Sequence, residues 1–422
     1  MNRKRTIRSA LPLALAVALT IAGCTSTPKK NDKPGRETVD TEELSVKVLT
    51  KRAKKGEVAS QLTLGKMYYQ GTGVDKDYRE AVRWFREAAK ADNAVAQFNL
   101  GLCYDLGHGL DASAERALRW YGKAAEAGIL QAQLNAAVLL DERGDRREAL
   151  EYWKRAADSG FVPAKKELAS RHLNGIGTPV DEVAAANLLK ECAKTGDAES
   201  QVALGLLYRD GRGVKQSIPD MFDWIWLAAQ NGNPDGQTRL AYCFMHGIGT
   251  PKDRATAATW YAEAANAGYA PAQVAYGNCL LQGTGVARDL DAAIEWFEKA
   301  AAQDDPLGQF SMAITYLRGR GRPKDTTQAV EWLRKSANQG YAQAQYELGR
   351  LHENGEAMPK NPRKAFERYR QAAEQGDPEG TAALGRCYLR GIGTEPAPEK
   401  ARKYLETAAE MGIQEARRLL EE

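Results

Sequence analysis

Apolar and small residues recur along most of the chain with the spacing of an amphipathic helix. In the stretch 270–305, five such residues follow one another at i, i+3, i+4, i+7 and i+8: Ala272, Ala275, Tyr276, Cys279 and Leu280. This spacing places them on one face of a helix. We name this first helix of the stretch helix A.

A second helical stripe follows within the same stretch. Gly283 and Gly285 supply two positions that tolerate positive φ, and Asp289 stands where the N-cap residue of a helix belongs. The apolar stripe of this second helix, helix B, consists of Ala293, Trp296, Phe297, Ala300 and Ala301. The stretch therefore predicts an antiparallel helical hairpin.

The hairpin recurs along the chain. The small residue before the first turn of each hairpin returns in steps of 36 residues, with a single step of 32: Gly65, Gly101, Ala137, Ala169, Gly205, Ala241, Gly277, Ala313, Gly349 and Gly385. A fixed period of this size is typical of a solenoid, in which each unit buries its apolar face by stacking on its neighbours. The sequence predicts an all-α solenoid of about ten hairpins over residues 57–413.

The repeat resembles a known family. From Ser60 to Asp92 the chain nearly completes the pattern A-x-A-Q-x-x-L-G-x-x-Y-x-x-G-x-G-V-x-x-D, followed by A-x-x-W-x-x-x-A-A-x-x-G. This pattern is similar to the Sel1-like repeat, a relative of the tetratricopeptide repeat. The resemblance covers nearly all of the chain after residue 56, and it implies a right-handed α/α solenoid that works as an adaptor for other proteins.

Residues 1–23 read as a lipoprotein signal peptide. Basic residues between Arg3 and Arg8 precede an apolar run over 10–21, which is too short for a spanning helix. Residues 21–24, Ile-Ala-Gly-Cys, resemble a bacterial lipobox, which implies that Cys24 becomes the first mature residue and carries acyl chains. Thr25, in place of Asp, then favours the outer membrane. An ordinary cleaved signal or an uncleaved anchor is the alternative.

Three further segments flank the repeats. Residues 24–40 hold the lipidated cysteine and a polar stretch with prolines that cannot bury enough surface to fold, so we expect a flexible tether. Residues 41–56 predict an N-terminal capping helix and residues 414–422 a polar C-terminal capping helix. Without residues 1–23 the chain has 55 basic and 55 acidic residues, a balance that does not suggest a nucleic-acid partner.

The tryptophans are expected in the core between repeats. Six of them share one column of helix B: Trp84, Trp120, Trp224, Trp260, Trp296 and Trp332. Trp226 lies off this column and is expected to be exposed. Leu188 and Arg368 replace the tryptophan in two units, and Ala357 replaces a turn glycine. In the short third unit, Asp145 and Glu148 predict a capping box.

Candidate catalytic and metal-binding groups are few. The cysteines after Cys24 are expected to be buried thiols, because neighbouring hairpins lie about 9–10 Å apart whereas a disulfide needs Cα atoms within about 7 Å. The four histidines are scattered, so we expect no metal and no cofactor. Residues 26–29 and 194–196 match two motifs of serine β-lactamases, but no nucleophile and base are paired with them. A β-lactam-interacting enzyme is therefore the disfavoured alternative.

The partner site is expected on helix A. Positions −2, +1 and +5, counted from the small residue, escape the apolar stripe and share one face, which lines the concave groove in tetratricopeptide relatives. The candidate residues there are Arg239, Tyr242, Asn278, Gln282, Arg318, Arg350, Asn354, Arg386 and Arg390. Arginine binds carboxylates bidentately, so we expect capture of acidic or carboxylate-rich segments. The alternative is an ordinary solvated helix face.

Together these features predict a membrane-anchored scaffold that binds other proteins of a bacterial cell envelope and faces the periplasm. A periplasmic scaffold lipoprotein of an exopolysaccharide export complex is a second reading, because some lipoproteins with such repeats have that role. The sequence carries no signal for the identity of the partner.

Overall fold

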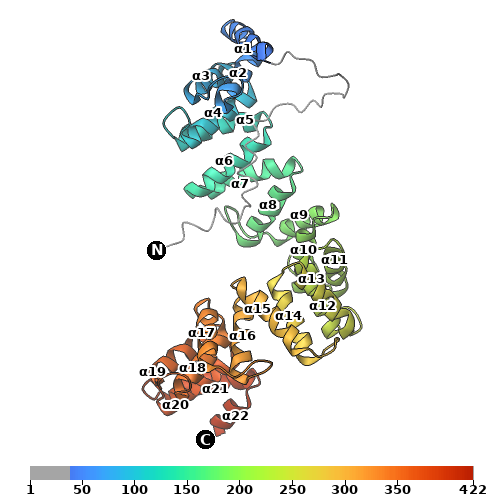
Figure 1. Ribbon diagram of the computed structural model, residues 1–422, viewed down its shortest axis with the longest axis vertical. Helices are drawn as coiled ribbons and strands as arrows, with labels where there is room; N and C mark the ends of the chain where they lie inside the picture. The colour runs from blue at the N-terminus through green and yellow to red at the C-terminus, as the bar shows by residue number, and fades with distance from the viewer. Residues whose placement is uncertain (1–38, 422) are drawn as a thin grey trace. The chain divides into compact units, whose positions relative to one another are not determined.

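The computed structural model describes residues 39–421, which form α-helices joined by short turns (Figure 1). The helices of the first half are α1 (Val39–Lys54), α2 (Val58–Gln70), α3 (Tyr78–Lys90), α4 (Ala94–Leu106), α5 (Ala114–Glu126), α6 (Leu130–Arg143), α7 (Arg146–Asp158), α8 (Val162–Asn174), α9 (Glu182–Lys194), α10 (Ala198–Asp210) and α11 (Ile218–Gln230). Those of the second half are α12 (Pro234–His246), α13 (Arg254–Asn266), α14 (Ala270–Gln282), α15 (Leu290–Ala302), α16 (Pro306–Arg318), α17 (Thr326–Asn338), α18 (Ala342–Asn354), α19 (Pro362–Ala373), α20 (Pro378–Arg390), α21 (Pro398–Glu410) and α22 (Gln414–Glu421).

The predicted all-α solenoid of about ten helical hairpins is confirmed. From α2 to α21, each even-numbered helix is a helix A and the next odd-numbered helix is its helix B. α1 and α22 lie where the two capping helices were predicted. The predicted signal peptide, Cys24 and nearly all of the predicted tether lie outside the described residues. The described residues divide into two compact units, 39–192 with Arg212–Val214, and Ala193–Gly211 with 215–421.

Local sequence explains where α14 ends and where α15 begins. α14 ends at Gly283, which has φ +69°, and its N–H donates to the Cys279 carbonyl. α15 begins after Asp289, whose side chain accepts the N–H of Ala292 at 3.0 Å. These are the left-handed C-cap and the side-chain N-cap expected from the residue types.

The capping box predicted for the short third unit is wrong. The Asp145 side chain caps no backbone N–H and instead pairs with Arg143 at 3.1 Å. Only two residues connect α6 to α7, and they leave Asp145 with φ −80° and ψ 53°, away from the extended conformation of an N-cap.

A glutamine at the start of most A helices joins consecutive units. In α14, Gln273 Nε2 donates to the Ala265 carbonyl at the end of α13, and Gln273 Oε1 accepts from Gln303 Nε2 at 2.9 Å. The same pairing joins Gln309 to Gln339 at 3.0 Å and Gln345 to Gln375 at 2.7 Å. The glutamine therefore satisfies carbonyls that the preceding helix B leaves open at its C-terminus.

The core column of helix B lies one residue after the tryptophan column. Its members are at most 6 % exposed: Phe85, Tyr121, Trp153, Leu189, Ile225, Tyr261, Phe297, Leu333, Tyr369 and Leu405. In the units that have glycine as the small residue of helix A, the core-column side chain of helix B contacts helix A at that glycine. A Cβ on Gly277, for example, would lie 2.6 Å from the Phe297 ring.

The prediction that the tryptophan column is core is therefore wrong for most of its members. Trp84 is buried, but Trp120, Trp224, Trp260, Trp296 and Trp332 are only half-buried. The Lys299 ammonium lies 3.9 Å from the Trp296 ring centroid, and Lys335 lies 4.2 Å from that of Trp332. These rings therefore lie at the edge of the core, and each contacts a lysine ammonium on its outer face.

Trp226 is not the exposed residue that its position suggested. It is half-buried, with its ring centroid 6.0 Å from Phe222, 6.2 Å from Phe244 and 6.3 Å from Trp260. Trp226 joins an aromatic cluster between α11, α12 and α13.

The second glycine of the turn meets two demands. Gly285 has φ +73°, and a Cβ there would lie 1.9 Å from the Arg254 carbonyl oxygen in the first turn of α13. Both the left-handed backbone and the close approach of the preceding unit exclude a side chain. Ala357 holds the equivalent position in the ninth unit, with φ +62°.

Ala357→Gly should therefore stabilise the chain. A left-handed conformation costs a residue with a Cβ about 1–2 kcal/mol, and the larger entropy of glycine in the unfolded state offsets about 0.4–1 kcal/mol of that cost. We expect a net gain of about 0.5–1 kcal/mol in urea unfolding. The matched change Ala373→Gly, at the last residue of α19, should lower stability, and a loss of stability at both positions would contradict the argument.

Candidate functional site

The predicted site residues of the second compact unit lie on one exposed face of the A helices. We call positions −2, +1 and +5 of these helices the A-helix face. Tyr242 on α12 is 51 % exposed, and its ring contacts that of His246 in a tilted arrangement, with 4.3 Å between centroids and 43° between the ring planes. Asn278 and Gln282 on α14 and Arg318 on α16 are also exposed. α14 contacts both α12 and α16, so these side chains follow one another across adjacent helices.

Three of the predicted arginines are already paired with carboxylates. Arg239 Nε lies 2.9 Å from Asp235, and Arg350 lies 2.9 Å from Glu347 and 3.5 Å from Glu356. Such ion pairs neutralise the charge that a ligand would meet at Arg239 and Arg350.

The third, Arg386, bridges three helices. It lies 2.7 Å from Glu353 on α18 and 2.8 Å from Glu415 on α22, and only 22 % of its side chain is exposed. The ion pair with Glu415 joins α22 to the last repeat. An incoming carboxylate would have to displace one of these partners.

The remaining predicted residues differ in their partners. Asn354 is exposed and donates to Glu356 at 3.1 Å, and Arg390 is exposed at the end of α20. Within the described residues, Asn278, Gln282 and Arg318 make no hydrogen bond or ion pair through their side chains. The part of the A-helix face on α12, α14 and α16 is therefore the part with open hydrogen-bonding capacity.

Sequence analysis missed a polar cluster that recurs beneath this face. Tyr121 donates to Asp105 at 3.0 Å, and Tyr369 donates to Glu353 at 2.6 Å, each across 16 residues. Trp153 Nε1 donates to Asp141 at 2.9 Å across 12 residues, which is the same spacing less the four residues that the third unit lacks. The carboxylate at +4 of helix A, combined with a polar aromatic in the core column, is the signal that could have found these pairs.

The next helix A completes each cluster. Asn135 donates to the Tyr121 hydroxyl at 3.2 Å, Arg171 pairs with Asp141, and Arg386 pairs with Glu353. Burial and the Glu353 carboxylate raise the pKa of Tyr369 far above its usual range. The tyrosine is therefore neutral and can serve as a donor throughout the physiological range.

Arg171 is the most buried charged residue of these clusters, with 4 % exposure. It takes the core position that cysteine or leucine holds in most units. Besides Asp141 it pairs with Glu167 at 2.9 Å, and its guanidinium lies 5.5 Å from the Trp153 ring centroid. The cluster links α6, α7 and α8.

The buried thiols are not disposed to act as nucleophiles or metal ligands. Burial raises the pKa of Cys103 and of Cys387 to about 12 and that of Cys279 to about 11. Because the thiolate is the reactive form, these groups act as small apolar residues of the core. The described residues contain no group of three or more His, Cys, Asp or Glu placed to hold a metal ion.

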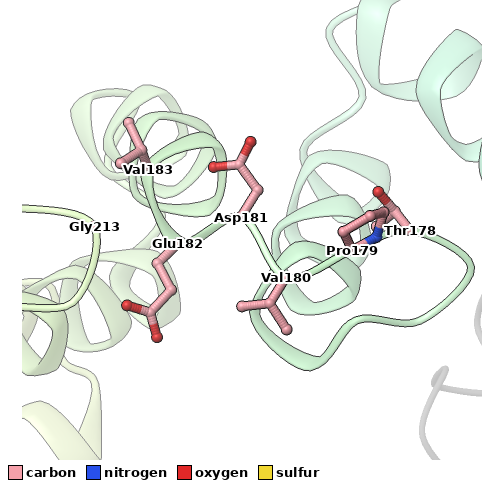
Figure 2. Close-up of a pocket in the computed structure, with 7 residues that line it drawn as sticks. All are labelled: Thr178, Pro179, Val180, Asp181, Glu182, Val183 and Gly213. Atoms are coloured by element: carbon pink, nitrogen blue, oxygen red, sulfur yellow. The ribbon is translucent and has the colours of Figure 1, made fainter.

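A hollow of about 560 Å³ lies at the start of α9 (Figure 2). Its lining residues are Thr178, Pro179, Val180, Asp181, Glu182, Val183 and Gly213. Asp181 accepts the N–H of Ala184 at 2.9 Å, and Glu182 pairs with Arg212 at 2.6 Å. Both carboxylates have partners, and no histidine, cysteine or lysine lines the hollow to pair with the Thr178 hydroxyl, so we assign no reaction to it.

None of the helices over residues 39–421 has the length and apolar character needed to cross a bilayer. This result concerns the repeats and their flanking helices.

Comparison with known proteins agrees with the hairpin geometry. The Sel1 repeat model matches ten segments: residues 58–93, 94–129, 131–161, 162–197, 198–233, 234–269, 270–305, 306–341, 342–377 and 378–413. A similar solved structure is c5321, a protective antigen of uropathogenic Escherichia coli strains that displays an SLR fold, at 32 % identity and TM-score 0.62. The match covers 88 % of this chain and 80 % of that one.

Another similar structure is a Sel1 repeat protein from Oxalobacter formigenes, at 23 % identity and TM-score 0.48, with 94 % of this chain and 97 % of that one covered. The stacked hairpins, the glycine turns and the ten matched segments lead to one conclusion: the chain belongs to the Sel1 repeat family.

Proposed function

We propose that this protein is a lipid-anchored scaffold that binds other proteins of a bacterial cell envelope through its A-helix face. Sel1 repeat proteins bind other proteins, and their solenoid fold suggests a scaffold rather than an enzyme. The attachment to the outer membrane, facing the periplasm, rests on the lipobox-like residues that end at Cys24.

One observation supports the choice of face. On α12, α14 and α16 an exposed aromatic, two amides and a guanidinium project from consecutive helices, and the amides and the guanidinium have no partner within the described residues. Aromatic and arginine side chains carry much of the binding energy at protein interfaces. A carboxylate of the partner would bind at Arg318, which has no ion pair within the described residues. Arg239, Arg350 and Arg386 are already paired with carboxylates of this chain.

Crosslinking and affinity capture with the full chain, in membranes of a source strain, test the face. We expect the double variant Tyr242→Ala/Asn278→Ala to lose the partners that the parent captures. Glu295→Ala is the matched control, because Glu295 is exposed on α15, outside the A-helix face. Equal capture by the double variant and the parent would place the partner site elsewhere.

Cys24→Ser tests the anchor. We expect this change to abolish incorporation of labelled fatty acid and to release the chain from the membrane fraction, because a soluble body needs acyl chains for stable attachment. The far-UV circular dichroism of the repeats should not change. A variant that still sediments with outer membranes and still carries label would refute the lipoprotein proposal.

A further inference from the structure

The open part of the A-helix face consists of side chains at equivalent positions of adjacent A helices. We call Tyr242, Asn278, Gln282 and Arg318 the inner stripe. Tyr242 and Asn278 hold the same +1 position of α12 and α14, and Gln282 and Arg318 hold the same +5 position of α14 and α16. Equivalent positions on packed helices lie about 8–10 Å apart. The inner stripe therefore offers a contact at about that interval.

This interval matches the period of one backbone conformation. A polyproline II helix has three residues per turn and rises about 3.1 Å per residue, so it presents the same edge about every 9 Å. A β-strand presents the same face about every 6.6–6.8 Å, which is shorter than the spacing between the helices, so its side chains would not meet equivalent positions on consecutive helices. A segment in polyproline II conformation can thus place one residue of each triplet on consecutive A helices.

The chemistry of the inner stripe fits the same conformation. Polyproline II has no internal hydrogen bonds, so its backbone carbonyls are open to donors. Asn278 and Gln282 each carry an NH₂ group that no described residue accepts from. Tyr242, 51 % exposed, supplies the kind of aromatic surface on which proline-rich segments dock.

The charges of the inner stripe and its neighbours indicate the charge of the segment that would bind there. Arg318 is the one cation of the inner stripe, and it has no ion pair within the described residues. The neighbouring Arg239 is neutralised by Asp235 at 2.9 Å. A complementary ligand is neutral along most of its length and carries one carboxylate at the α16 end. A polyanionic segment would gain little from α12 and α14.

From this match we infer that the inner stripe binds a neutral, proline-containing polypeptide segment in polyproline II conformation, with one carboxylate held by Arg318. The inference rests on the proposed protein-binding function of the A-helix face and names the chemistry of its partner. Crossing from α12 to α16 takes about 16–20 Å, or about six residues of such a segment.

Fluorescence anisotropy with the full chain and synthetic peptides tests the inference. The probe is a labelled peptide of about ten residues built from Pro-Pro-Ala triplets and ending in Glu, with a blocked C-terminus. The references are the same peptide ending in Gln and a β-prone peptide of alternating Val and Thr ending in Glu. We expect the Pro-Pro-Ala-Glu peptide to bind tightest.

Three variants assign the contacts. Tyr242→Ala and the double variant Asn278→Ala/Gln282→Ala should each weaken binding about tenfold. Arg318→Gln should abolish the preference for the Glu peptide over the Gln peptide and leave the affinity for the Gln peptide unchanged. Glu295→Ala should bind like the parent, and circular dichroism should confirm that every variant is folded.

Several results would overturn the inference: no measurable binding of the Pro-Pro-Ala-Glu peptide, equal or tighter binding of the Val-Thr peptide, or unchanged binding by the amide double variant. Affinity capture separates these failures from failure of the proposed function. If Tyr242→Ala/Asn278→Ala still abolishes partner capture, the A-helix face remains the binding site and only the class of occupant is wrong. If capture is unchanged, the proposed face itself is wrong.

Discussion

Asp141→Ala should lower the free energy of unfolding of the first compact unit by about 3–5 kcal/mol. The change removes the carboxylate that pairs with Arg171, which is 4 % exposed, and leaves a buried guanidinium with only Glu167 as an anionic partner. Removing one partner of a buried ion pair costs about this much, because the buried charge is then poorly compensated, here by the partly exposed Glu167 alone. Trp153 Nε1 also loses its acceptor.

Urea unfolding followed by tryptophan fluorescence and circular dichroism measures this loss. The matched control is Asp145→Ala, four residues further along, because Asp145 makes only an exposed pair with Arg143 and caps no helix. We expect the control to change stability by less than about 1 kcal/mol. A similar small effect of Asp141→Ala would show that solvent or Glu167 satisfies Arg171.

The double variant Asp141→Leu/Arg171→Leu tests whether the intact ion pair itself stabilises the fold, as distinct from the destabilisation caused by removing only one of its partners. Leucine occurs at both positions in other units of this chain, for example Leu207 at the position of Arg171 and Leu281 at that of Asp141. Replacing both charges with apolar side chains of similar size is often neutral or stabilising. We therefore expect the double variant to be more stable than Asp141→Ala, apart from the acceptor that Trp153 loses.

The fold could be predicted almost completely from the sequence because its determinants are local. Gly283 ends α14, Asp289 begins α15, and both roles follow from the residue type. Repetition then fixes the neighbours, since each hairpin packs on the next. The short third unit broke the rule because a two-residue connection cannot hold the extended N-cap that the other turns provide.

The register of the core could not be predicted because Trp296 and Phe297 are adjacent. Both fit the helical stripe of Ala293 and Ala300, so the spacing predicts a place in the stripe for both rings and does not show that only Phe297 is fully buried. The choice depends on the space across the hairpin, where Gly277 leaves room for the Phe297 ring. The spacing of apolar residues within helix B carries no information about the space that helix A leaves at Gly277.

The arginine partners show the same limit. Arg350 and Glu347 are three residues apart in one helix, a spacing that can be recognised as an ion pair from the sequence. Arg386 meets Glu415 from α22 and Glu353 from α18, so its partners become visible only when three helices are stacked. The residues of the A-helix face could be named from periodicity, but which of them are open could not.

Phe297→Ala should destabilise α14–α16 more than Trp296→Ala does. Phe297 is 2 % exposed, and removing such a ring leaves a cavity at a cost of about 3–5 kcal/mol. Trp296 is half-buried beneath Lys299, so its loss should cost only about 2 kcal/mol. Hydrogen exchange of the backbone amides of α14, α15 and α16 measures the local free energy of opening. The exposed neighbour Glu295→Ala is the control, and an equal or larger effect of Trp296→Ala would contradict the register.

The same contact predicts that the effect of Gly277→Ala changes sign with its partner. In the parent, the new Cβ would lie 2.6 Å from the Phe297 ring, so the ring or α14 must shift and stability falls. In the Phe297→Ala background the methyl group enters the cavity, and alanine is about 1 kcal/mol better than glycine in a helix interior. Gly277→Ala should then slow amide exchange in α14 that the single Phe297→Ala variant had accelerated. An effect of the same sign in both backgrounds would mean that Gly277 and the side chain at 297 are not in contact.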